Sequence, residues 1–191
     1  MEPVTVRKLD DRTETARKAA GIFVDAYYDD LKEISGSREI LIDIFSKSLI
    51  LSHFYGAYSC DSLMGIFALS DEKERSFRLD KRAVIEKIGF MKGHIVYGVL
   101  KRELERPIRM NKPGVYIEAV ATDPGAQGRG IATKMMRHVI DNFGHSELDV
   151  VDTNYGALHI YRKLGFRVYK EEKARKNMRY SKKIYMEYDS V

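Results

Sequence analysis

The sequence contains a single cysteine, Cys60, and no long uninterrupted run of apolar residues. One cysteine cannot form an internal disulfide or a thiolate metal site. None of the apolar segments approaches the ~20 residues that a membrane-spanning helix requires. The first residues, Met1 to Val4, include an acid and a proline and lack the basic-then-apolar pattern of a signal peptide. These absences predict a cytoplasmic protein with no membrane partner and no metal.

Charge of one sign is not concentrated along most of the chain. The 33 lysines and arginines exceed the 28 aspartates and glutamates, which gives a formal net charge of +5. A basic balance suits a phosphorylated cofactor or nucleic acid. Because both signs are interspersed, a solvated basic surface explains the charge better, and the sequence shows no recognised nucleic-acid-binding motif. We therefore expect no nucleic-acid partner.

The 191 residues, 44% of them hydrophobic, suffice for one globular domain, and no repeat or linker divides the chain. We therefore expect a single domain over residues 1–191. Periodicity and turn residues in the first half predict these elements, in chain order: a strand at 4–8, a helix capped by Asp11 and Glu14 that ends at 35–37, a second helix from about 40, a hairpin of 53–59 and 63–69, a charged loop at 71–80, and a helical segment at 81–105 interrupted at Gly89 and Gly93.

The second half of the chain has the clearest patterns. Residues 115–122 are apolar on both alternating faces apart from Glu118, which predicts a strand buried on both sides. The elements expected after it are a turn at 123–125, a helix at 128–143, a strand at 147–152, a helix at 155–164 ended by Gly165, and strands at 166–170 and 183–188. This order predicts a mixed α/β (α+β) fold with helices covering a largely antiparallel sheet.

A glycine-rich segment, residues 125–133, lies between the predicted buried strand and the predicted helix that follows it. Such a loop suits a phosphate, because glycines allow close backbone approach and a helix N-terminus offers unpaired N–H groups. An ATP- or GTP-binding P-loop is rejected, since Ile131 and Ala132 occupy the places of the required lysine and serine or threonine.

A dinucleotide-binding loop fits the same segment in part. Gly128 and Gly130 have the right spacing, and Asp149 lies about 20 residues further on, as that fingerprint requires. However, Thr133 replaces the third glycine, and too little chain remains for the repeated βαβ units. Dinucleotide binding therefore stays a weaker alternative.

The segment also resembles a third kind of loop. Gln127-x-x-Gly130-x-Ala132 is similar to the Q/R-x-x-G-x-G/A signature of the GCN5-related N-acetyltransferase (GNAT) family. The strand at 116–124 precedes it as in that family. Downstream, Asn154 and then Tyr161-Arg-Lys-Leu-Gly-Phe166 match the family's asparagine and its tyrosine-bearing helix in order and spacing. The close resemblance covers about residues 114–170.

The resemblance implies a GNAT-like fold, with residues 71–112 as a helical insertion between the third and fourth strands, and acetyl-CoA (coenzyme A) as the cofactor. In that family the strand before the loop diverges from the next strand, and the pantetheine arm of the cofactor fills the gap. The implied cofactor-binding residues are backbone groups of Val120 and Thr122 for the arm, an amide near Val120 or Ala121 for the thioester carbonyl, Gln127 of the signature, N–H groups of Gly128, Arg129, Gly130, Ile131, Ala132 and Thr133 for the pyrophosphate, and Asn154 and Tyr161.

Two side chains are the candidates for catalysis, Tyr161 from the resemblance and Glu118 from its place in the predicted buried strand. Tyr161 takes the family's position for the acid that protonates the leaving thiolate, and its alternative role is packing in the core. Glu118 is the candidate base, because a buried carboxylate tends to have a raised pKa. The alternative for Glu118 is a structural pair with a basic neighbour. Asp149, on the next strand, is the second candidate for the base.

The expected reaction is direct attack of a primary amine, on a small molecule or a peptide, on acetyl-CoA. We expect the insertion at 71–112 to lie beside the mouth of the site and to shape the acceptor pocket. Its alternative roles are a structural buttress or a contact in a homodimer. The alternative functions are a non-catalytic acyl-CoA-binding sensor and, with less support, a dinucleotide-binding protein. The acceptor itself stays open.

Overall fold

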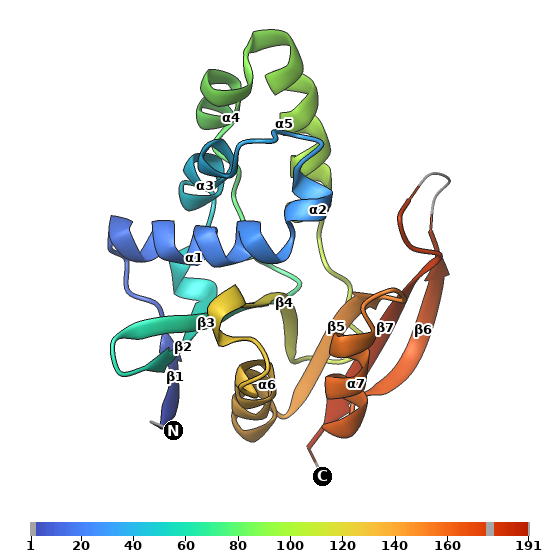
Figure 1. Cartoon of the computed structure of the whole chain (residues 1–191). Coiled ribbons are helices and arrows are strands. Elements are labelled where there is room, and N and C mark those ends of the chain that lie inside the picture. The colour runs from blue at the N-terminus through green and yellow to red at the C-terminus, as the bar shows by residue number, and fades with distance from the viewer. Residues whose placement is uncertain (1–2, 175–177, 191) are drawn as a thin grey trace.

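The protein is described by a computed structural model that covers residues 3–174 and 178–190. Its strands form one seven-stranded sheet in the order β1-β2-β3-β4-β5-β7-β6 (Figure 1). All neighbouring strands pair antiparallel except β4 and β5, which are parallel. The strands are β1 (Val4–Lys8), β2 (Phe54–Ser59), β3 (Ser62–Ser70), β4 (Val115–Thr122), β5 (His145–Val151), β6 (Arg167–Lys173) and β7 (Lys182–Asp189). The mixed, mostly antiparallel sheet expected from the sequence is confirmed.

Helices cover both faces of this sheet. They are α1 (Thr13–Ala26), α2 (Tyr28–Leu31), α3 (Arg38–Ser46), α4 (Lys81–Ile88), α5 (Phe90–Leu104), α6 (Ile131–Asn142) and α7 (Tyr155–Lys163), with short 3-10 turns η1 (Leu51–His53) and η2 (Pro124–Ala126). Alternate residues of β3 pack on the two sides: Ile66 joins the cluster of α1, and Phe67 joins the cluster of α6 and α7. None of the described helices is long and apolar enough to cross a membrane.

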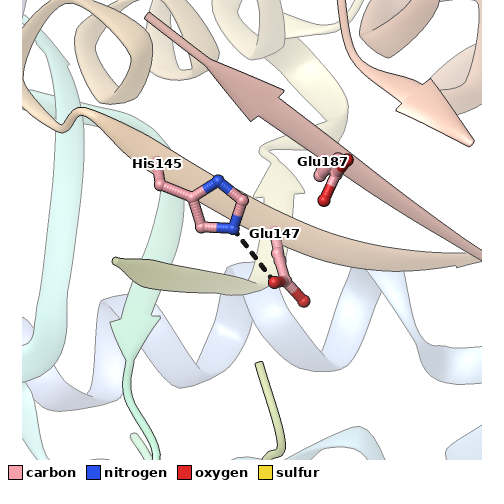
Figure 2. A group of neighbouring side chains, drawn as sticks. All are labelled: His145, Glu147 and Glu187. Atoms are coloured by element: carbon pink, nitrogen blue, oxygen red, sulfur yellow. Dashed lines mark hydrogen bonds and ion pairs between the residues drawn. The ribbon is translucent and has the colours of Figure 1, made fainter. Parts of the chain in front are cut away.

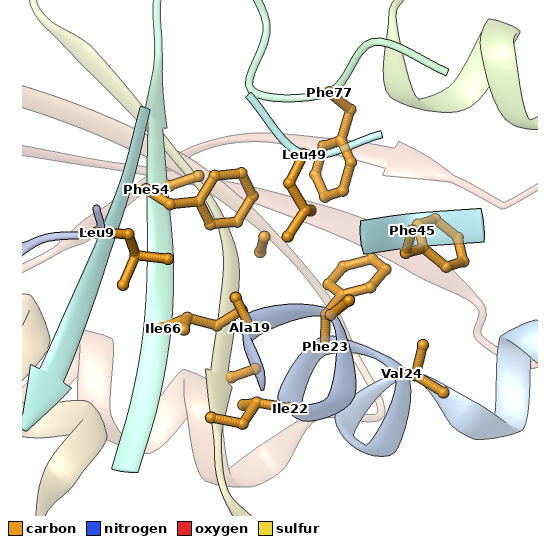
Figure 3. Packing of buried hydrophobic residues seen from close by; sticks show 14 of the residues in the cluster. Leu9, Ala19, Ile22, Phe23, Val24, Phe45, Leu49, Phe54, Ile66 and Phe77 are labelled. Atoms are coloured by element: carbon orange, nitrogen blue, oxygen red, sulfur yellow. The ribbon is translucent and has the colours of Figure 1, made fainter. Parts of the chain in front are cut away.

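The core between α1 and the sheet is built around phenylalanine rings (Figure 3). Phe23 of α1 lies 5.0 Å from Phe45 and 5.2 Å from Phe77, measured between ring centroids. Phe77 belongs to the loop at 71–80, which the sequence predicts as charged and whose first residues, 71–74, are exposed. Burial of this one aromatic ring anchors the start of the insertion to the main core.

Two helix starts differ from the sequence prediction. The expected capping pair Asp11 and Glu14 is wrong: α1 follows Arg12, and it is Asp10 that accepts a hydrogen bond from the Arg12 backbone N–H at 3.2 Å. Helix α6 begins at Ile131 rather than at residue 128, because Gly128 and Gly130 have φ angles of 74° and 73°. That left-handed backbone cannot continue a right-handed helix.

The insertion at 71–112 forms a pair of helices, α4 and α5. Gly89, with a φ angle of 95°, separates them as the sequence predicts. Gly93, by contrast, does not interrupt α5 but lies inside it, against α4. A Cβ atom built on Gly93 would lie 2.9 Å from the Cα of Ile85, closer than real Cβ contacts, so this glycine permits the close approach of the two helices.

Gly93 and Gly98 of the same helix form a matched pair for a stability test. A Cβ built on Gly98 meets nothing within 4 Å, so Gly98→Ala should raise the free energy of unfolding by about 0.5–1 kcal/mol through helix propensity. Gly93→Ala should instead lower it by about 1–3 kcal/mol, because the methyl group forces the helices apart. Urea unfolding of both variants measures the difference; equal effects would contradict the close contact.

Candidate functional site

The two parallel strands β4 and β5 pair over only three residues each. Val115, Tyr116 and Ile117 pair with the segment 146–148. Beyond this point the remainder of β4 pairs only with β3, and the remainder of β5 pairs only with β7. The strands therefore diverge toward their C-terminal ends (Figure 1), and β5 offers no backbone pairing to residues 118–122. An extended ligand can pair with these backbone groups as an added strand would.

A bulge lies in β4 where the divergence begins. Ala68 pairs with Glu118 and Ile66 with Ala121, so Ala119 and Val120 together face one residue of β3. Ala119 has a φ angle of 55°, a conformation that costs a non-glycine residue about 1–2 kcal/mol. The sequence gives no signal for this bulge. Strained backbone of this kind is common at functional sites, where the surrounding fold maintains it.

The glycine loop follows directly after β4. Gln127, Gly128, Arg129 and Gly130 are all exposed, and a Cβ built on either glycine meets nothing within 4 Å. No side chain caps the first turn of α6, so the N–H groups at 131–133 are the unpaired donors of a helix start. Open glycines beside such donors fit a phosphate group, and Arg129 adds a positive charge in solvent.

The phenol of Tyr161, on α7, interacts electrostatically with Asp149 of β5 and with Tyr27. Its side chain is buried and packs against Phe166, with ring centroids 5.8 Å apart. Among the described residues, no hydrogen bond contributes to the pKa of its hydroxyl. Burial, and then the charge of Asp149, raise the pKa of Tyr161. The phenol therefore stays protonated at physiological pH and can donate its proton to a ligand.

Asn154 caps the helix that presents this tyrosine. Its side-chain oxygen accepts a hydrogen bond from the Ala157 backbone N–H at 3.1 Å. Asn154 is thus the N-cap of α7 and orients its first turn. A contact between Asn154 and the cofactor stays a prediction.

Glu118 is surrounded by hydrogen-bond donors. Its carboxylate accepts from Arg75 Nη2 at 2.6 Å, from the Ser76 backbone N–H at 3.1 Å, and from the hydroxyls of Ser70 and Ser76. Arg75 in turn donates to the backbone carbonyl of Arg106. The side chain of Glu118 is 11% exposed. This environment matches the alternative role expected for Glu118, a structural pair with a basic neighbour. Through Arg75 and Ser76, Glu118 joins both ends of the insertion to β4.

Asp149 of β5 has fewer partners and is more accessible. Its carboxylate accepts a hydrogen bond from the Tyr116 hydroxyl at 2.5 Å and lies 3.0 Å from Lys183 Nζ. Its side chain is 27% exposed. It raises the pKa values of Tyr161 and of Tyr27, although burial is the larger cause for both. Asp149 is thus the carboxylate whose charge contributes to the raised pKa of Tyr161.

Four residues around these carboxylates were not predicted from the sequence. Tyr27 donates a long hydrogen bond of 3.4 Å to the carbonyl of Val120, in the bulge. Tyr116, two positions before Glu118, faces the same side of the sheet, and strand alternation alone could have indicated it. Arg75 and Lys183 come from distant segments, and no local pattern reports such partners.

A second cluster of ionisable side chains lies at the other end of β5 (Figure 2). His145, Glu147 and Glu187 bring potential metal-ligand atoms within 4.8 Å of one another. Glu147 is fully buried, and its two oxygens already accept hydrogen bonds from the Asn111 backbone N–H at 2.7 Å and the Tyr169 hydroxyl at 2.6 Å.

A protonated histidine explains this cluster better than a metal ion. His145 Nε2 lies 3.0 Å from Glu147 and its Nδ1 lies 2.8 Å from Asp189. Burial opposes the charge on His145, but the hydrogen bonds to Glu147 and Asp189 outweigh it and raise the pKa of the ring. A metal ligand needs a deprotonated ring nitrogen, so this raised pKa favours an ionic clasp between β5 and β7.

Comparison with known proteins agrees with the geometry of the divergent strands and the glycine loop. The profile of the Acetyltransferase (GNAT) family matches residues 50–166, more than half of the chain. The chain therefore belongs to the GNAT family of N-acetyltransferases, whose members use acetyl-CoA. The family predicted from the loop and its downstream residues is confirmed.

Two solved structures share the fold. An N-acetyltransferase from Staphylococcus aureus Mu50 is similar with a TM-score of 0.68 and 18% identity, covering 96% of this chain and 100% of that one. An acetyltransferase from Bacillus subtilis, solved in complex with CoA, is similar with a TM-score of 0.56 and 12% identity, covering 99% and 100%.

One characterised relative matches in sequence over a short stretch. The streptothricin acetyltransferase of Streptomyces lavendulae is 40% identical over 55 residues, which are 26% of this chain and 29% of the relative. The match thus spans under a third of the relative's length.

The ionic clasp at His145 predicts a specific pH dependence of stability. Because the pKa of His145 is raised in the folded state, its contribution is fully present below the unfolded pKa of about 6.5. It is lost as the pH rises through the raised folded value. His145→Gln should therefore lose more stability at pH 6 than at pH 9, as measured by urea unfolding. His159→Gln, on an exposed position of α7, is the control; a pH-independent loss in His145→Gln would contradict the clasp.

Proposed function

We propose that this protein transfers the acetyl group of acetyl-CoA to a primary amine of a small molecule or peptide by direct attack. The observation that supports this most is the electrostatic interaction of the buried, protonated phenol of Tyr161 with the carboxylate of Asp149, on the strand that diverges from β4. Acyl transfer to an amine requires a proton donor and a proton acceptor that can reach the same reacting groups. The streptothricin acetyltransferase similarity favours a small-molecule acceptor over a protein.

The residues of the chain fit the cofactor at two places. Backbone N–H groups at 128–133 would hold the pyrophosphate, since Gly128 and Gly130 leave open space above them. Backbone groups of Val120, Ala121 and Thr122, which β5 does not pair, would bind the pantetheine arm. When bound, acetyl-CoA supplies an electrophilic thioester carbon and a thiolate leaving group.

Tyr161 acts as the general acid in this proposal. Its raised pKa keeps the phenol protonated, so that it can donate to the leaving thiolate. General acid catalysis of this kind contributes roughly 10²–10⁴-fold in rate. The burial of the ring within the α6–α7 side of the core fixes its orientation.

Asp149 is better placed than Glu118 to act as the general base. Glu118 accepts hydrogen bonds from Arg75, Ser70 and Ser76, so its lone pairs are occupied. Asp149 is more exposed and interacts with Tyr161. We assign Asp149 to the deprotonation of the acceptor and Glu118 to holding the insertion against β4.

The test of this function is CoA release with a panel of primary amines, together with calorimetric titration of acetyl-CoA. Turnover with at least one amine supports the proposal. Tight acetyl-CoA binding without turnover of any amine would favour the sensor alternative, and absence of acetyl-CoA binding would refute the cofactor assignment.

Tyr161→Phe should lower kcat by roughly 100-fold or more, while the KM for acetyl-CoA changes little, because only the transition state uses the donated proton. Steady-state CoA release measures both constants. Tyr188→Phe is the control, since Tyr188 packs against the same Phe166 at 5.6 Å and should keep its kcat. An unchanged kcat in Tyr161→Phe would remove the tyrosine from the mechanism.

The two carboxylates differ in their effect on the pH profile of kcat/KM. Asp149→Asn should lower kcat/KM by roughly 100-fold and change the shape of its pH profile, because the base is lost. Glu118→Gln should keep the shape of the profile but lower the free energy of unfolding by about 2–4 kcal/mol, since Arg75 loses its buried partner. The opposite pattern would return the role of base to Glu118.

A further inference from the structure

A lysine occupies the space beside the proposed base. Lys183 of β7 lies 3.0 Å from the Asp149 carboxylate, and the two side chains are 35% and 27% exposed. Burial opposes the charge on Lys183, but Asp149 and, more weakly, Glu103 keep its pKa raised. Lys183 is therefore an ammonium ion, and within the described residues Asp149 is its one salt-bridge partner.

Charged side chains of both signs lie on the segments around Lys183. Glu103 and Arg106, at the end of the insertion, act electrostatically on Lys183 and on Tyr185 of the same strand. Shortly before β7, Arg179 pairs with Glu33 at 3.3 Å. A polyamine acceptor would need an excess of acidic groups here, and this balanced set does not supply it.

An acceptor amine that binds Asp149 must compete with Lys183. If the acceptor brings only a positive charge, then Lys183 loses its partner while it remains partly buried, and an unpaired charge in such a position is costly. If the acceptor also brings a carboxylate, its ammonium replaces Lys183 at Asp149 and its carboxylate replaces Asp149 at Lys183. Each charge then keeps an opposite partner, so the exchange is neutral.

We propose that the acceptor carries a carboxylate near its primary amine, as an amino acid does, and that the pair Asp149 and Lys183 recognises the two groups. This inference rests on the proposed function, because it places the acceptor at the carboxylate of Asp149. Lys183 is then a specificity-determining residue, and it takes no part in the transfer of protons.

The chemical balance of the transfer is simple. The acceptor ammonium gives one proton to Asp149, which passes it to solvent. The nitrogen then forms a bond to the acetyl carbon, the carbon–sulfur bond breaks, and Tyr161 gives a proton to the sulfur. The second proton of the nitrogen restores Tyr161 through solvent. An ammonium and a thioester thus give an amide, a thiol and one released proton, with no oxidation or reduction.

The test compares amino acids with their carboxamides, which keep the amine and the size but lack the negative charge. For the wild type, kcat/KM for the best amino acid should exceed that for its carboxamide by about tenfold or more. A tenfold ratio corresponds to a free-energy difference of ~1.4 kcal/mol. Lys183→Met should remove most of this preference, and Lys183→Glu should reverse it. Lys182→Met is the matched control, because Lys182 pairs with Glu171 instead, at 2.8 Å, and should keep the wild-type preference.

Equilibrium binding gives a second readout that does not depend on turnover. Calorimetric titration of the same amino acid and carboxamide into the protein saturated with CoA should show the same preference, lost in Lys183→Met. An unchanged preference in Lys183→Met and Lys183→Glu, or a wild-type preference for carboxamides or polyamines, would overturn the inference. In those cases amines are still acetylated, so the proposed function stands; no turnover of any amine would instead refute the proposed function itself.

Discussion

The short pairing between β4 and β5 is the constraint on which the other features depend. If the two parallel strands paired along their whole length, the backbone groups of residues 118–122 would be hydrogen-bonded to β5. An extended ligand could then not pair with them. Pairing stops after Ile117, and the bulge at Ala119 follows at once. The glycine loop follows β4 directly, and the charge of Asp149 on β5 acts on the phenol of Tyr161. The fold thus leaves the C-terminal part of β4 without a partner strand on its β5 side, although β4 lies in the middle of the sheet. An extended ligand can pair with the backbone there.

The divergence has to be held open without loss of the sheet, and Glu118 contributes to this. Its carboxylate joins β4 to Arg75 and Ser76 at the start of the insertion, and Arg75 reaches the carbonyl of Arg106 near its end. Phe77 anchors the same loop in the aromatic core. The insertion is therefore tied to the strand that would bind the cofactor arm, rather than packed elsewhere as an independent helical pair. Near the end of its last helix, α5, the charge of Glu103 helps to raise the pKa of Lys183 on β7.

Sequence patterns predicted most of the fold, because they report local constraints. Alternation and helical periodicity located β4, α7 and the helix after the glycine loop, and the family motif linked Gly130 to Tyr161. The start of α6 was misplaced because two left-handed glycines, not hydrophobic periodicity, decide where it begins. The partner of Glu118 could not be predicted at all, since Arg75 lies 43 residues away and no periodic pattern extends across the insertion. For the same reason the sequence left two roles open for Glu118, a base and a structural pair with a basic neighbour.

Three carboxylates on one side of the sheet show how the environment separates their roles. Each has a basic partner: Glu147 has His145, Glu118 has Arg75, and Asp149 has Lys183. The side chain of Glu147 is 0% exposed, that of Glu118 is 11% exposed and that of Asp149 is 27% exposed. A buried, fully hydrogen-bonded pair is expensive to break and therefore holds structure. A partly exposed pair can exchange partners at much lower cost. The same type of ion pair is thus buried at one end of β5, where His145 also contacts Asp189 of β7, and is partly exposed and exchangeable at the other end, where Asp149 acts on Tyr161.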